Sequence, residues 1–549
     1  MKVLVTDTIS ETGVDLLRRE KDFQVEVRPS MSREELLQVV ADVDGMMTRS
    51  GTPLDGEVLA AAKRLRVVAR AGVGVDNIDI GEASRRGVVI INAPTGNTLA
   101  ATEHTMALML SLVRRVPQAW QSVGRGEWKR SRFMGMQLSG KRLLIVGLGR
   151  IGTQIAQRCR AFGMEILAYD PYITAAKAER AGVRLLDDLT GGLALADVVT
   201  LHVPLTGETR GMIGARQLKA CKPGAYLVNC ARGGLVDEQA CAEAVRSGHL
   251  TGVAFDVYDG EPPRADNPLF AEDIRDRVVL TPHIGANTEE AQSAVAVIAA
   301  TNLAAALLGR PYEHAVNLPF SETQLSDEKR NYLSLARKMG YLAAHLLRDP
   351  VKECKVTLRG PLFSSGDEPV CFEVPYHYSP FTIAGLKGLL EFSHGPEVNY
   401  MSAPLLAADK GIVVEEGRTE SGTYRNLVEM TLVTTSGAHE GVTLAGTITE
   451  EGRQRVVNID GYWIDFVPEG VVLLFNNHDR PGVIGKVGSL LGAAGSNIAN
   501  FALGRKNGSG LAVGALQIDN DVPDSVIEAF REDADLIWAV KVNFSEFHS

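Results

Sequence analysis

Short runs of β-branched residues alternate with stretches of helical periodicity through the first hundred residues. The helix-like stretches cover 11–20 and 54–64, and turn signals stand at Pro53 and Gly87. Strands that alternate with helices predict an α/β unit built on a parallel sheet. The strand-like runs are KVLVT (2–6), RVVA (66–69) and VVII (88–91).

A long apolar helical pattern covers 98–119 and begins at Thr98, a candidate helix cap. A second α/β series follows, in which six strand-like runs are separated by helical segments. This pattern is typical of a doubly wound parallel sheet that binds a dinucleotide. The six runs are RLLIVG (142–147), EILAYD (165–170), DVVTLHVP (197–204), AYLVNCA (225–231), GVAFDV (252–257) and RVVLTPH (277–283).

The block after this series is less regular. A long helix is expected over 286–309, an exit strand at HAVNLPF (314–320) and another helix over 326–348. Strand-like runs punctuated by glycine follow, and they predict an α+β domain. These runs are CKVTLRG (354–360), NLVEMTLVTT (426–435), VTLAGTITE (442–450) and RVVNIDGYWIDFV (455–467).

The last part of the chain, 471–549, has the order β-α-β-β-α-β. This order is typical of a ferredoxin-like domain. The expected helices cover 481–494 and 522–531, and the strands are VVLLFNN (471–477), NIANFAL (497–503), LAVGALQI (511–518) and WAVKVNF (538–544).

The composition is that of an ordinary globular protein. The chain has 549 residues, of which 45% are hydrophobic and 23% are charged, and its formal net charge is −10. A chain of this length predicts three or four domains. Because the basic residues form no long block, neither nucleic acid nor an anionic membrane is expected as the main partner, although a local basic pocket stays open.

The cysteines and the first residues bear on where the protein works. The six cysteines form no C-x-x-C pair, which is typical of reduced thiols and predicts neither disulfides nor a structural zinc site. The start, MKVLVTDTIS, has the pattern of neither a signal peptide nor an anchor, and we expect no window with the ~20 apolar residues of a membrane span. We therefore expect a cytoplasmic protein without a bound metal. The cysteines are Cys159, Cys221, Cys230, Cys241, Cys354 and Cys371.

The stretch VGLGRIG (146–152) follows an apolar run and opens a helical pattern. Its glycines Gly147, Gly149 and Gly152 permit a tight turn, the approach of a diphosphate and close packing of helix on strand. The helix N-terminus offers free N–H groups to phosphates. Asp170 follows Gly152 by 18 residues, at the end of the next strand-like run, where an acid binds the adenosine ribose and repels a 2′-phosphate. The sequence therefore predicts NAD rather than NADP.

Three successive strand-like runs of the second series end in an arginine, a carboxylate and an imidazole. These residues are Arg232, Glu261 and His283. Oxidation of a 2-hydroxy acid needs this set, because a guanidinium holds the carboxylate, an imidazole takes the hydroxyl proton, and an acid fixes the imidazole tautomer. Each residue taken alone also fits a structural role: a surface charge, a solvated loop acid or a packing histidine. Their order behind a dinucleotide motif favours the catalytic interpretation.

At this point the sequence resembles a known family. The stretches VGLGRIG, NCARGGLVDEQA, AFDVYDGEPP and TPHIGANTEEAQ look like signatures of the D-isomer-specific 2-hydroxyacid dehydrogenases, and ARAGVGVDNID (69–79) and NAPTGNTLAATEH (92–104) extend the likeness over about residues 1–317. The resemblance implies Arg232, Glu261 and His283 as the catalytic set. It also implies Asp256 as a nicotinamide-side contact, and Arg150 and Ile151 as cofactor contacts.

The resemblance also implies the substrate. Arg49 in MMTRSGT and Asn97 in TGNT match substrate-contacting positions, and the implied reaction is oxidation of a phosphorylated 2-hydroxy acid, 3-phospho-D-glycerate. The basic cluster WKRSRF, with Lys129, Arg130 and Arg132, would supply further cations across a dimer contact, or it is a solvated basic face. Val73 replaces a threonine found in some relatives, which leaves one polar cofactor contact in doubt.

The tail resembles the ACT regulatory module, which binds small amino acids between paired modules. The stretch NNHDRPGVIGKVGSLLGAAGSNIANFAL (476–503) places Asn477, Asp479 and Asn497 at ligand positions, and L-serine is the implied effector. Alternatively, the module only dimerises. The block over about 320–465 resembles the intervening domain of long family members, in which Arg453 and Arg455 either bind phosphate-bearing effectors or are surface charges. Paired modules predict a homodimer or homotetramer.

Together these arguments predict an α/β protein with four domains. A flavodoxin-like substrate domain (1–98 and 286–317) surrounds a doubly wound NAD domain (99–285), and an α+β intervening domain (318–468) and a ferredoxin-like ACT domain (469–549) follow. Two other functions stay open: a reductase of glyoxylate or hydroxypyruvate, and an NAD-sensing scaffold for protein partners. The ACT tail and Arg49 speak against the first, and a complete catalytic set speaks against the second.

Overall fold

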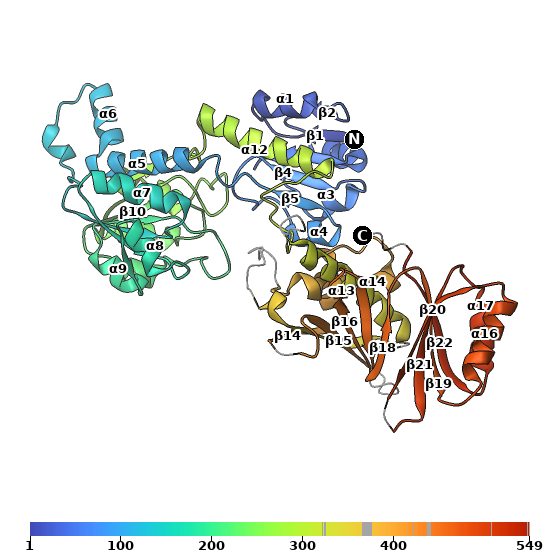
Figure 1. Ribbon diagram of the computed structural model, residues 1–549. Helices are drawn as coiled ribbons and strands as arrows, with labels where there is room; N and C mark the ends of the chain where they lie inside the picture. Colours follow the sequence, from blue (N-terminus) through green and yellow to red (C-terminus); the bar gives the residue numbers. More distant parts are fainter. Residues whose placement is uncertain are drawn as a thin grey trace.

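Three sheets organise the chain, and Figure 1 shows them in three blocks that follow one another in sequence colour. The structure is a computed structural model, and it describes residues 1–549 except 321, 323–324, 348, 365–375, 421, 436–440, 507, 546 and 548–549. Cys371 and the last residue of the helix expected over 326–348 therefore lie outside the described residues. The other five cysteines are free thiols.

The first sheet is five-stranded and parallel, in the order β2-β1-β3-β4-β5. This is the flavodoxin-like order, and apolar side chains fill both of its faces. The strands are β1 (Lys2–Val5), β2 (Gln24–Val27), β3 (Gly45–Thr48), β4 (Val67–Arg70) and β5 (Val89–Ile91), and the helices between them are α1 (Glu11–Arg19), α2 (Arg33–Val39), α3 (Gly56–Ala61) and α4 (Ile80–Arg85).

A helix from much later in the chain completes this block. Helix α12 (Glu289–Leu307) packs on α1 and on strands β3 and β4. By length and composition alone it is apolar enough to cross a membrane, so the expectation that no such window exists was wrong. Its apolar side chains Val295, Ala299 and Leu303 belong to the core of the first sheet, which explains its composition.

The second sheet is seven-stranded and parallel, in the order β12-β11-β10-β9-β6-β7-β8. From β6 the chain adds β7 and β8 on one side and then β9 to β12 on the other, and this change of side between β6 and β9 is the switch point of a doubly wound fold. The strands are β6 (Arg142–Val146), β7 (Glu165–Tyr169), β8 (Arg184–Leu186), β9 (Val198–Leu201), β10 (Ala225–Asn229), β11 (Leu250–Phe255) and β12 (Val278–Leu280), and the covering helices include α5 (Thr98–Arg114), α7 (Arg150–Ala161), α8 (Ala175–Arg180), α9 (Leu189–Leu195), α10 (Ala215–Ala220) and α11 (Glu238–Arg246).

The long helix expected over 98–119 is interrupted. Helix α5 ends at Arg115, whose φ of 53° is left-handed, and α6 (Val116–Gly124) then starts in a new direction. In Figure 1, α6 and the loop after it extend away from the second sheet as an arm. The residue at the N-cap of α5 is Asn97 rather than Thr98.

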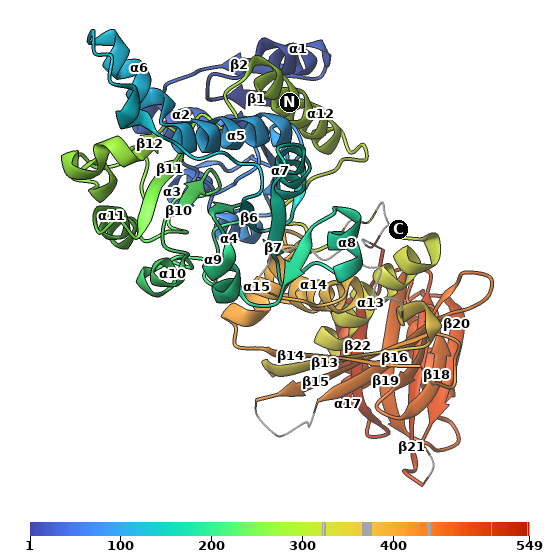
Figure 2. The same ribbon diagram turned by 90° about the vertical axis from the view of Figure 1, so that its left-hand side faces the viewer.

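The third sheet has ten strands and spans the rest of the chain, in the order β14-β13-β15-β16-β17-β18-β20-β21-β19-β22. Its first part contains β13 (Val351–Arg359), β14 (Val413–Thr419), β15 (Leu427–Thr434), β16 (Val442–Ile448), β17 (Gln454–Ile459) and β18 (Tyr462–Phe466), covered by helices α13 (Asp327–Leu346), α14 (Pro380–His394) and α15 (Ser402–Asp409). Helix α15 packs against α4 of the first block (Figure 2). Arg85 of α4 pairs there with Asp409 of α15.

The last four strands form the expected β-α-β-β-α-β unit with the order β20-β21-β19-β22, which is ferredoxin-like. The sheet continues into this unit through the ladder pair of Trp463 with Arg505, and the unit also shares a hydrophobic core with the preceding strands and α13. The elements are β19 (Val471–His478), α16 (Val483–Ala493), β20 (Ile498–Arg505), β21 (Leu511–Ile518), α17 (Asp524–Glu532) and β22 (Leu536–Asn543).

The fold class is therefore confirmed, while several single elements were predicted wrongly. The run HAVNLPF is not a strand, because only Ala315 forms an isolated bridge, to Ile91. The second sheet has seven strands rather than six, since the short β8 was missed. In the third sheet, β14, α14 and α15 were also missed, and the run 455–467 forms two strands.

Candidate active site and cofactor cavity

The glycine loop between β6 and α7 has the three features that its spacing predicts. Gly147 has a φ of 93°, and a Cβ there would lie 2.5 Å from the carbonyl oxygen of His202. A Cβ on Gly152 would lie 2.2 Å from the carbonyl oxygen of Gly147. A Cβ on Gly149 would meet no atom of the described chain within 4 Å. The loop is closed toward the protein at two glycines and open toward solvent at the middle one, at the N-terminus of α7.

Asp170 follows β7 directly and faces this loop. Its Oδ2 accepts a hydrogen bond of 2.9 Å from the N–H of Leu148, and its Oδ1 accepts one of 3.0 Å from the N–H of Tyr172. These bonds hold the carboxylate beside the glycine loop, at the carboxyl edge of the sheet, where ligands of doubly wound sheets bind.

A cavity of about 320 Å³ extends from the glycine loop along the carboxyl ends of β9, β10 and β11. Side chains from the start of α5 and α7 close it. Arg150 and Ile151 line this cavity, and Arg150 also donates to the carbonyl of Pro94 at 3.5 Å. The other lining residues used below are Val73, Asn97, His202, Arg232, Asp256 and His283.

His283 and Glu261 are directly paired. The Nδ1 of His283 lies 2.5 Å from Oε2 of Glu261. The other carboxylate oxygen of Glu261 accepts from the N–H of Tyr258 at 3.2 Å, and the Tyr258 hydroxyl donates to the carbonyl of Thr281 at 3.0 Å. The loop that carries Glu261 is thus bonded to the strand end that carries His283. Because Glu261 occupies Nδ1 of the imidazole, Nε2 is the nitrogen that can bind another partner.

Asp256 supports the backbone around His283. Its side chain is 1% exposed, and it accepts hydrogen bonds from the hydroxyl of Thr281 and from the N–H groups of Ile284 and Gly285. Burial raises the pKa of Asp256, but the bonds from His104, Thr281 and Ile284 outweigh it, so the pKa lies below its ordinary value. The carboxylate that was expected to contact nicotinamide is therefore engaged mainly by the loop that carries His283.

Arg232 reaches across from the second sheet to the first block. Its Nη1 donates to the carbonyl of Ala231 at 2.8 Å, and its Nε lies 3.2 Å from Oδ2 of Asp76. A Cβ on Gly74 would lie 2.2 Å from its Nη2, so the guanidinium rests against the glycine backbone. Arg232 therefore stands at the boundary between the two blocks.

A second cavity, of about 410 Å³, adjoins the first and shares Val73, Asn97, Arg232, His283 and Ala286 with it. Three guanidinium groups line it: those of Arg49, Arg70 and Arg232. Burial, together with the charge of Arg232, lowers the pKa of Arg70 to about 10, and burial also lowers the pKa of Arg49. Three cations in one cavity beside an imidazole form a site for a multiply charged anion.

Sequence reasoning missed Arg70, although a signal was present. Arg70 ends strand β4 of the first sheet in the same way as Arg232 follows β10 of the second, and both therefore lie at the carboxyl edge of a parallel sheet. Its Nε is buried and has no hydrogen-bond partner among the described residues, and the same is true of Oδ1 of Asn97. Buried polar atoms without partners at the wall of a cavity mark positions that a ligand can satisfy.

The remaining predicted cations lie outside both cavities. Lys129, Arg130 and Arg132 are exposed on the arm after α6, where Arg132 pairs with Asp276 at 2.7 Å. Arg455 pairs with Asp465 at 2.7 Å on the third sheet. In one chain these groups do not reach the catalytic cavity. Among the described residues, no group of three or more His, Cys, Asp or Glu side chains is arranged to hold a metal ion.

The three candidate effector residues do not meet within one chain. Asn477, near the end of β19, pairs with Ala512, at the start of β21, whereas Asn497 directly precedes Ile498, which pairs with Ile518, the last residue of β21. Asn497 is therefore at the opposite end of the sheet from Asn477. Asp479 is close to Asn477 in sequence, but its carboxylate is held by the guanidinium of Arg505 at 2.8 Å.

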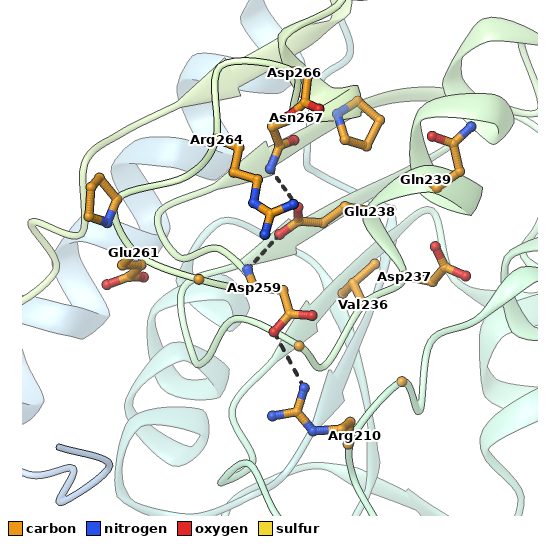
Figure 3. Close-up of a pocket in the computed structure, with 15 residues that line it drawn as sticks. Arg210, Val236, Asp237, Glu238, Gln239, Asp259, Glu261, Arg264, Asp266 and Asn267 are labelled. Carbon is orange, nitrogen blue, oxygen red and sulfur yellow. Dashed lines mark hydrogen bonds and ion pairs between the residues drawn. The ribbon is translucent and has the colours of Figure 1, made fainter. Parts of the chain in front are cut away.

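A trough of about 790 Å³ lies behind the loop that carries Glu261. Figure 3 shows Glu261 at its edge and Asp259 between Glu238 and Arg210. Glu238 accepts from the N–H of Asp259 at 2.8 Å and from the side-chain amide of Asn267 at 2.6 Å. These bonds hold the Glu261 loop from the side away from the catalytic cavity.

Two family models match the chain. The model for the D-isomer specific 2-hydroxyacid dehydrogenase, NAD binding domain, matches residues 106–285, and the model for the D-3-phosphoglycerate dehydrogenase intervening domain matches residues 328–460. The first range contains the glycine loop and the three predicted catalytic residues. NAD is therefore the cofactor, and the open space at Gly149 fits its diphosphate.

Similar proteins match nearly the whole chain. D-3-phosphoglycerate dehydrogenase of Archaeoglobus fulgidus is 43% identical over 531 residues, which cover 96% of this chain and 97% of that protein. The enzyme of the same name from Methanocaldococcus jannaschii is 40% identical over 532 residues, with 97% and 98% covered. Among solved structures, the TT0316 protein from Thermus thermophilus is 37% identical with a TM-score of 0.53, over 58% of this chain and 100% of that chain.

These matches agree with the doubly wound fold and with a dinucleotide cofactor. The chain belongs to the D-isomer-specific 2-hydroxyacid dehydrogenases and, within them, to the NAD-dependent D-3-phosphoglycerate dehydrogenases that carry an intervening domain.

Proposed function

We propose that this NAD-dependent dehydrogenase oxidises 3-phospho-D-glycerate to 3-phosphohydroxypyruvate in L-serine biosynthesis. One observation carries the proposal: the cavity beside His283 is lined by three guanidinium groups. A carboxylate and a phosphate on one small substrate need several cations at once, and a cavity of this charge would be costly for a neutral ligand.

The chemistry follows from the contacts of each residue. Arg232 binds the substrate carboxylate beside the cofactor cavity, and Nε2 of His283 takes the proton of the C2 hydroxyl as C2 becomes a carbonyl. Glu261 holds Nδ1 of His283 at 2.5 Å, which fixes the tautomer and stabilises the imidazolium that forms. NAD would supply the hydride acceptor for C2. Arg150 and Ile151, which line the first cavity, and Asp170, which faces the glycine loop, would hold it.

The phosphate is the part of the substrate that Arg49 and Arg70 bind. Both side chains line the cavity from the first block, opposite Arg232. The buried Nε of Arg70 and Oδ1 of Asn97 gain partners when substrate and cofactor enter. Lys129 and Arg130 are exposed and lie outside the cavity of their own chain. In the proposed assembly they add positive charge to the cavity of a second subunit.

The exposed arm supports a paired molecule. Trp120, Trp128 and Met134 on α6 and the following loop are 75%, 76% and 82% exposed. Large apolar side chains in one exposed segment mark an association surface, and a second copy of the chain covers it in the proposed homodimer or homotetramer.

L-serine is the proposed effector, bound between two C-terminal units. Asn477 and Asp479 of one copy and Asn497 of another surround it, since these positions lie at opposite ends of the sheet in a single copy. The Oδ1 of Asn477 is buried without a hydrogen-bond partner in the described part of the chain, which suits a site completed by a ligand.

The test is the rate of NADH formation with 3-phospho-D-glycerate and with D-glycerate, which lacks only the phosphate. We expect kcat/KM to be at least about a hundredfold higher with the phosphorylated acid, as for a buried site whose charged groups would otherwise stay unpaired. Arg70→Gln should remove most of this preference and leave the rate with D-glycerate nearly unchanged. Comparable turnover of the two acids by the unmodified enzyme would contradict the proposal.

A further inference from the structure

One acid lies where an anion is expected to bind. Among the residues that line the arginine cavity, the carboxylates are Glu261, which is paired with His283, and Asp76. Asp76 faces Arg232 with 3.2 Å between Oδ2 and Nε, and its side chain is 61% exposed. A negative charge beside the guanidinium that binds the substrate carboxylate needs an explanation.

Asp76 occupies a fixed turn of the first block. The N–H of Ile78 donates to the carbonyl of Val75 at 2.9 Å, which closes the turn around Asp76 and Asn77. The side-chain amide of Asn77 donates to the carbonyls of Arg49 and Thr52 at 2.8 and 2.7 Å. The turn is thus attached to the loop that carries Arg49.

Arg232 comes from the other block, so its pair with Asp76 crosses the boundary between them. One loop of the first block contacts the guanidinium of Arg232 at two points. The backbone of Gly74 packs against Nη2, and the carboxylate of Asp76 pairs with Nε. On its own side, Nη1 donates to the carbonyl of Ala231. Nε and one end of the guanidinium are therefore held, while Nη2 keeps its hydrogens for another acceptor.

We infer that Asp76 is a positioning residue for substrate binding, which acts by holding Arg232 across the boundary between the two blocks. This inference rests on the proposed role of Arg232 in binding the substrate carboxylate. Asp76 holds Arg232, and its neighbour Asn77 bonds the backbone of Arg49. One turn therefore positions both arginines, and with them the sites for the carboxylate and the phosphate of the substrate.

The opposite role, in which Asp76 competes with the substrate for Arg232, is weaker on this geometry. Asp76 contacts Nε and leaves Nη2 free, so a carboxylate can approach from the cavity without displacing it. Its repulsion of an incoming anion is screened by water, because more than half of the side chain is exposed. Without Asp76, in contrast, the Arg232 side chain would be mobile in the free enzyme, and ordering it would cost conformational entropy each time substrate binds.

The experiment is a double-mutant cycle on the full-length enzyme with Asp76→Asn, Arg232→Lys and both changes. The readouts are KM for 3-phospho-D-glycerate, kcat, and the NADH dissociation constant from fluorescence. We expect Asp76→Asn to raise KM about fivefold, the effect of one partly exposed ion pair, with smaller changes in kcat and none in NADH binding. In the Arg232→Lys background, Asp76→Asn should alter KM less than twofold, because the guanidinium that Asp76 holds is already absent.

A matched control is Asp42→Asn, which removes another exposed aspartate of the first block, paired with Arg64 at 2.8 Å and distant from the cavity residues. It should leave all three constants unchanged. An unchanged or lowered KM in Asp76→Asn, with a raised KM in Arg232→Lys, would overturn the positioning role and leave the proposed function intact. An unchanged KM in Arg232→Lys would overturn the proposed role of Arg232 and the inference with it.

Discussion

The catalytic cavity and the C-terminal unit bring their candidate residues together in opposite ways. Arg232, Glu261 and His283 follow neighbouring strands of a parallel sheet, and all three line one cavity of one chain. Asn477 and Asn497 also stand at strand ends, but they lie at opposite ends of β21. The catalytic trio comes from a single chain, whereas the proposed effector site needs another copy.

The difference comes from the end of the strand at which each residue lies. In a parallel sheet every strand ends at the same edge, so residues that follow successive strands converge whatever their separation in sequence. Strands β19 and β20 also run in the same direction, since both pair antiparallel with β21, but Asn477 lies near the end of β19 and Asn497 just before the start of β20. Residues that follow parallel strands can therefore be grouped into a site from sequence alone, whereas a residue that precedes its strand lies at the other edge and, in the proposed effector site, comes from another copy.

The strongest test of the one-chain catalytic site is His283→Ala. Without the base, kcat should fall by about 10²- to 10⁴-fold, while NADH binding measured by fluorescence should stay within about twofold. Mixed with Arg232→Ala subunits after dissociation and reassociation, it should give no recovery of activity, because each chain needs both residues. Recovery in the mixture would show that two chains share one site.

A pair of glycine variants separates cofactor binding from folding. A methyl group on Gly149 meets no atom of the described chain, so Gly149→Ala should keep its thermal midpoint but bind NADH roughly tenfold more weakly. A methyl group on Gly152 meets the backbone of Gly147 at 2.2 Å, so Gly152→Ala should lose about 1–3 kcal/mol of unfolding free energy. Equal effects of the two variants on both quantities would show that the loop is not open at its middle glycine.

The C-terminal site is tested by Asn477→Ala. We expect serine to inhibit the unmodified enzyme, and this variant to need at least about tenfold more serine for half-inhibition, with kcat and KM in the absence of serine unchanged. The cause is the loss of a buried amide that hydrogen-bonds the ligand. Initial rates over a serine series measure it, and an unaltered inhibition curve would remove Asn477 from the site.

The smallest expected effect is on pH dependence. Burial lowers the pKa of His202 to about 3, from an ordinary value of 6.5. The unfolded chain therefore binds more protons between these values, so this residue makes stability fall as the pH drops below about 6.5. His202→Gln cannot titrate, and its loss of stability between pH 7 and pH 6 should be smaller by about 0.7 kcal/mol. Thermal midpoints at the two pH values measure this, and parallel losses would contradict it.

Much of the fold followed from pattern because its strands are apolar and buried. Two of the strands that were missed lack that signal: β8 has three residues, and β14, at the edge of its sheet, has the polar sequence VVEEGRT. The catalytic trio was recognisable because all three residues follow strands of one sheet. Arg70 also ends a strand, but that strand belongs to the first sheet, and only the contact between the two blocks brings Arg70 and Asp76 to Arg232.

The most direct test of the contrast between the two sites is serine inhibition of hybrid enzymes made from Asn477→Ala and Asn497→Ala subunits. Each variant alone should be insensitive to serine, since every shared site then lacks one residue. In a hybrid pair, one of the two sites combines an intact Asn477 with an intact Asn497, so inhibition should return in part. Hybrids as insensitive as their parents, from preparations that exchange subunits, would contradict a site formed by two copies.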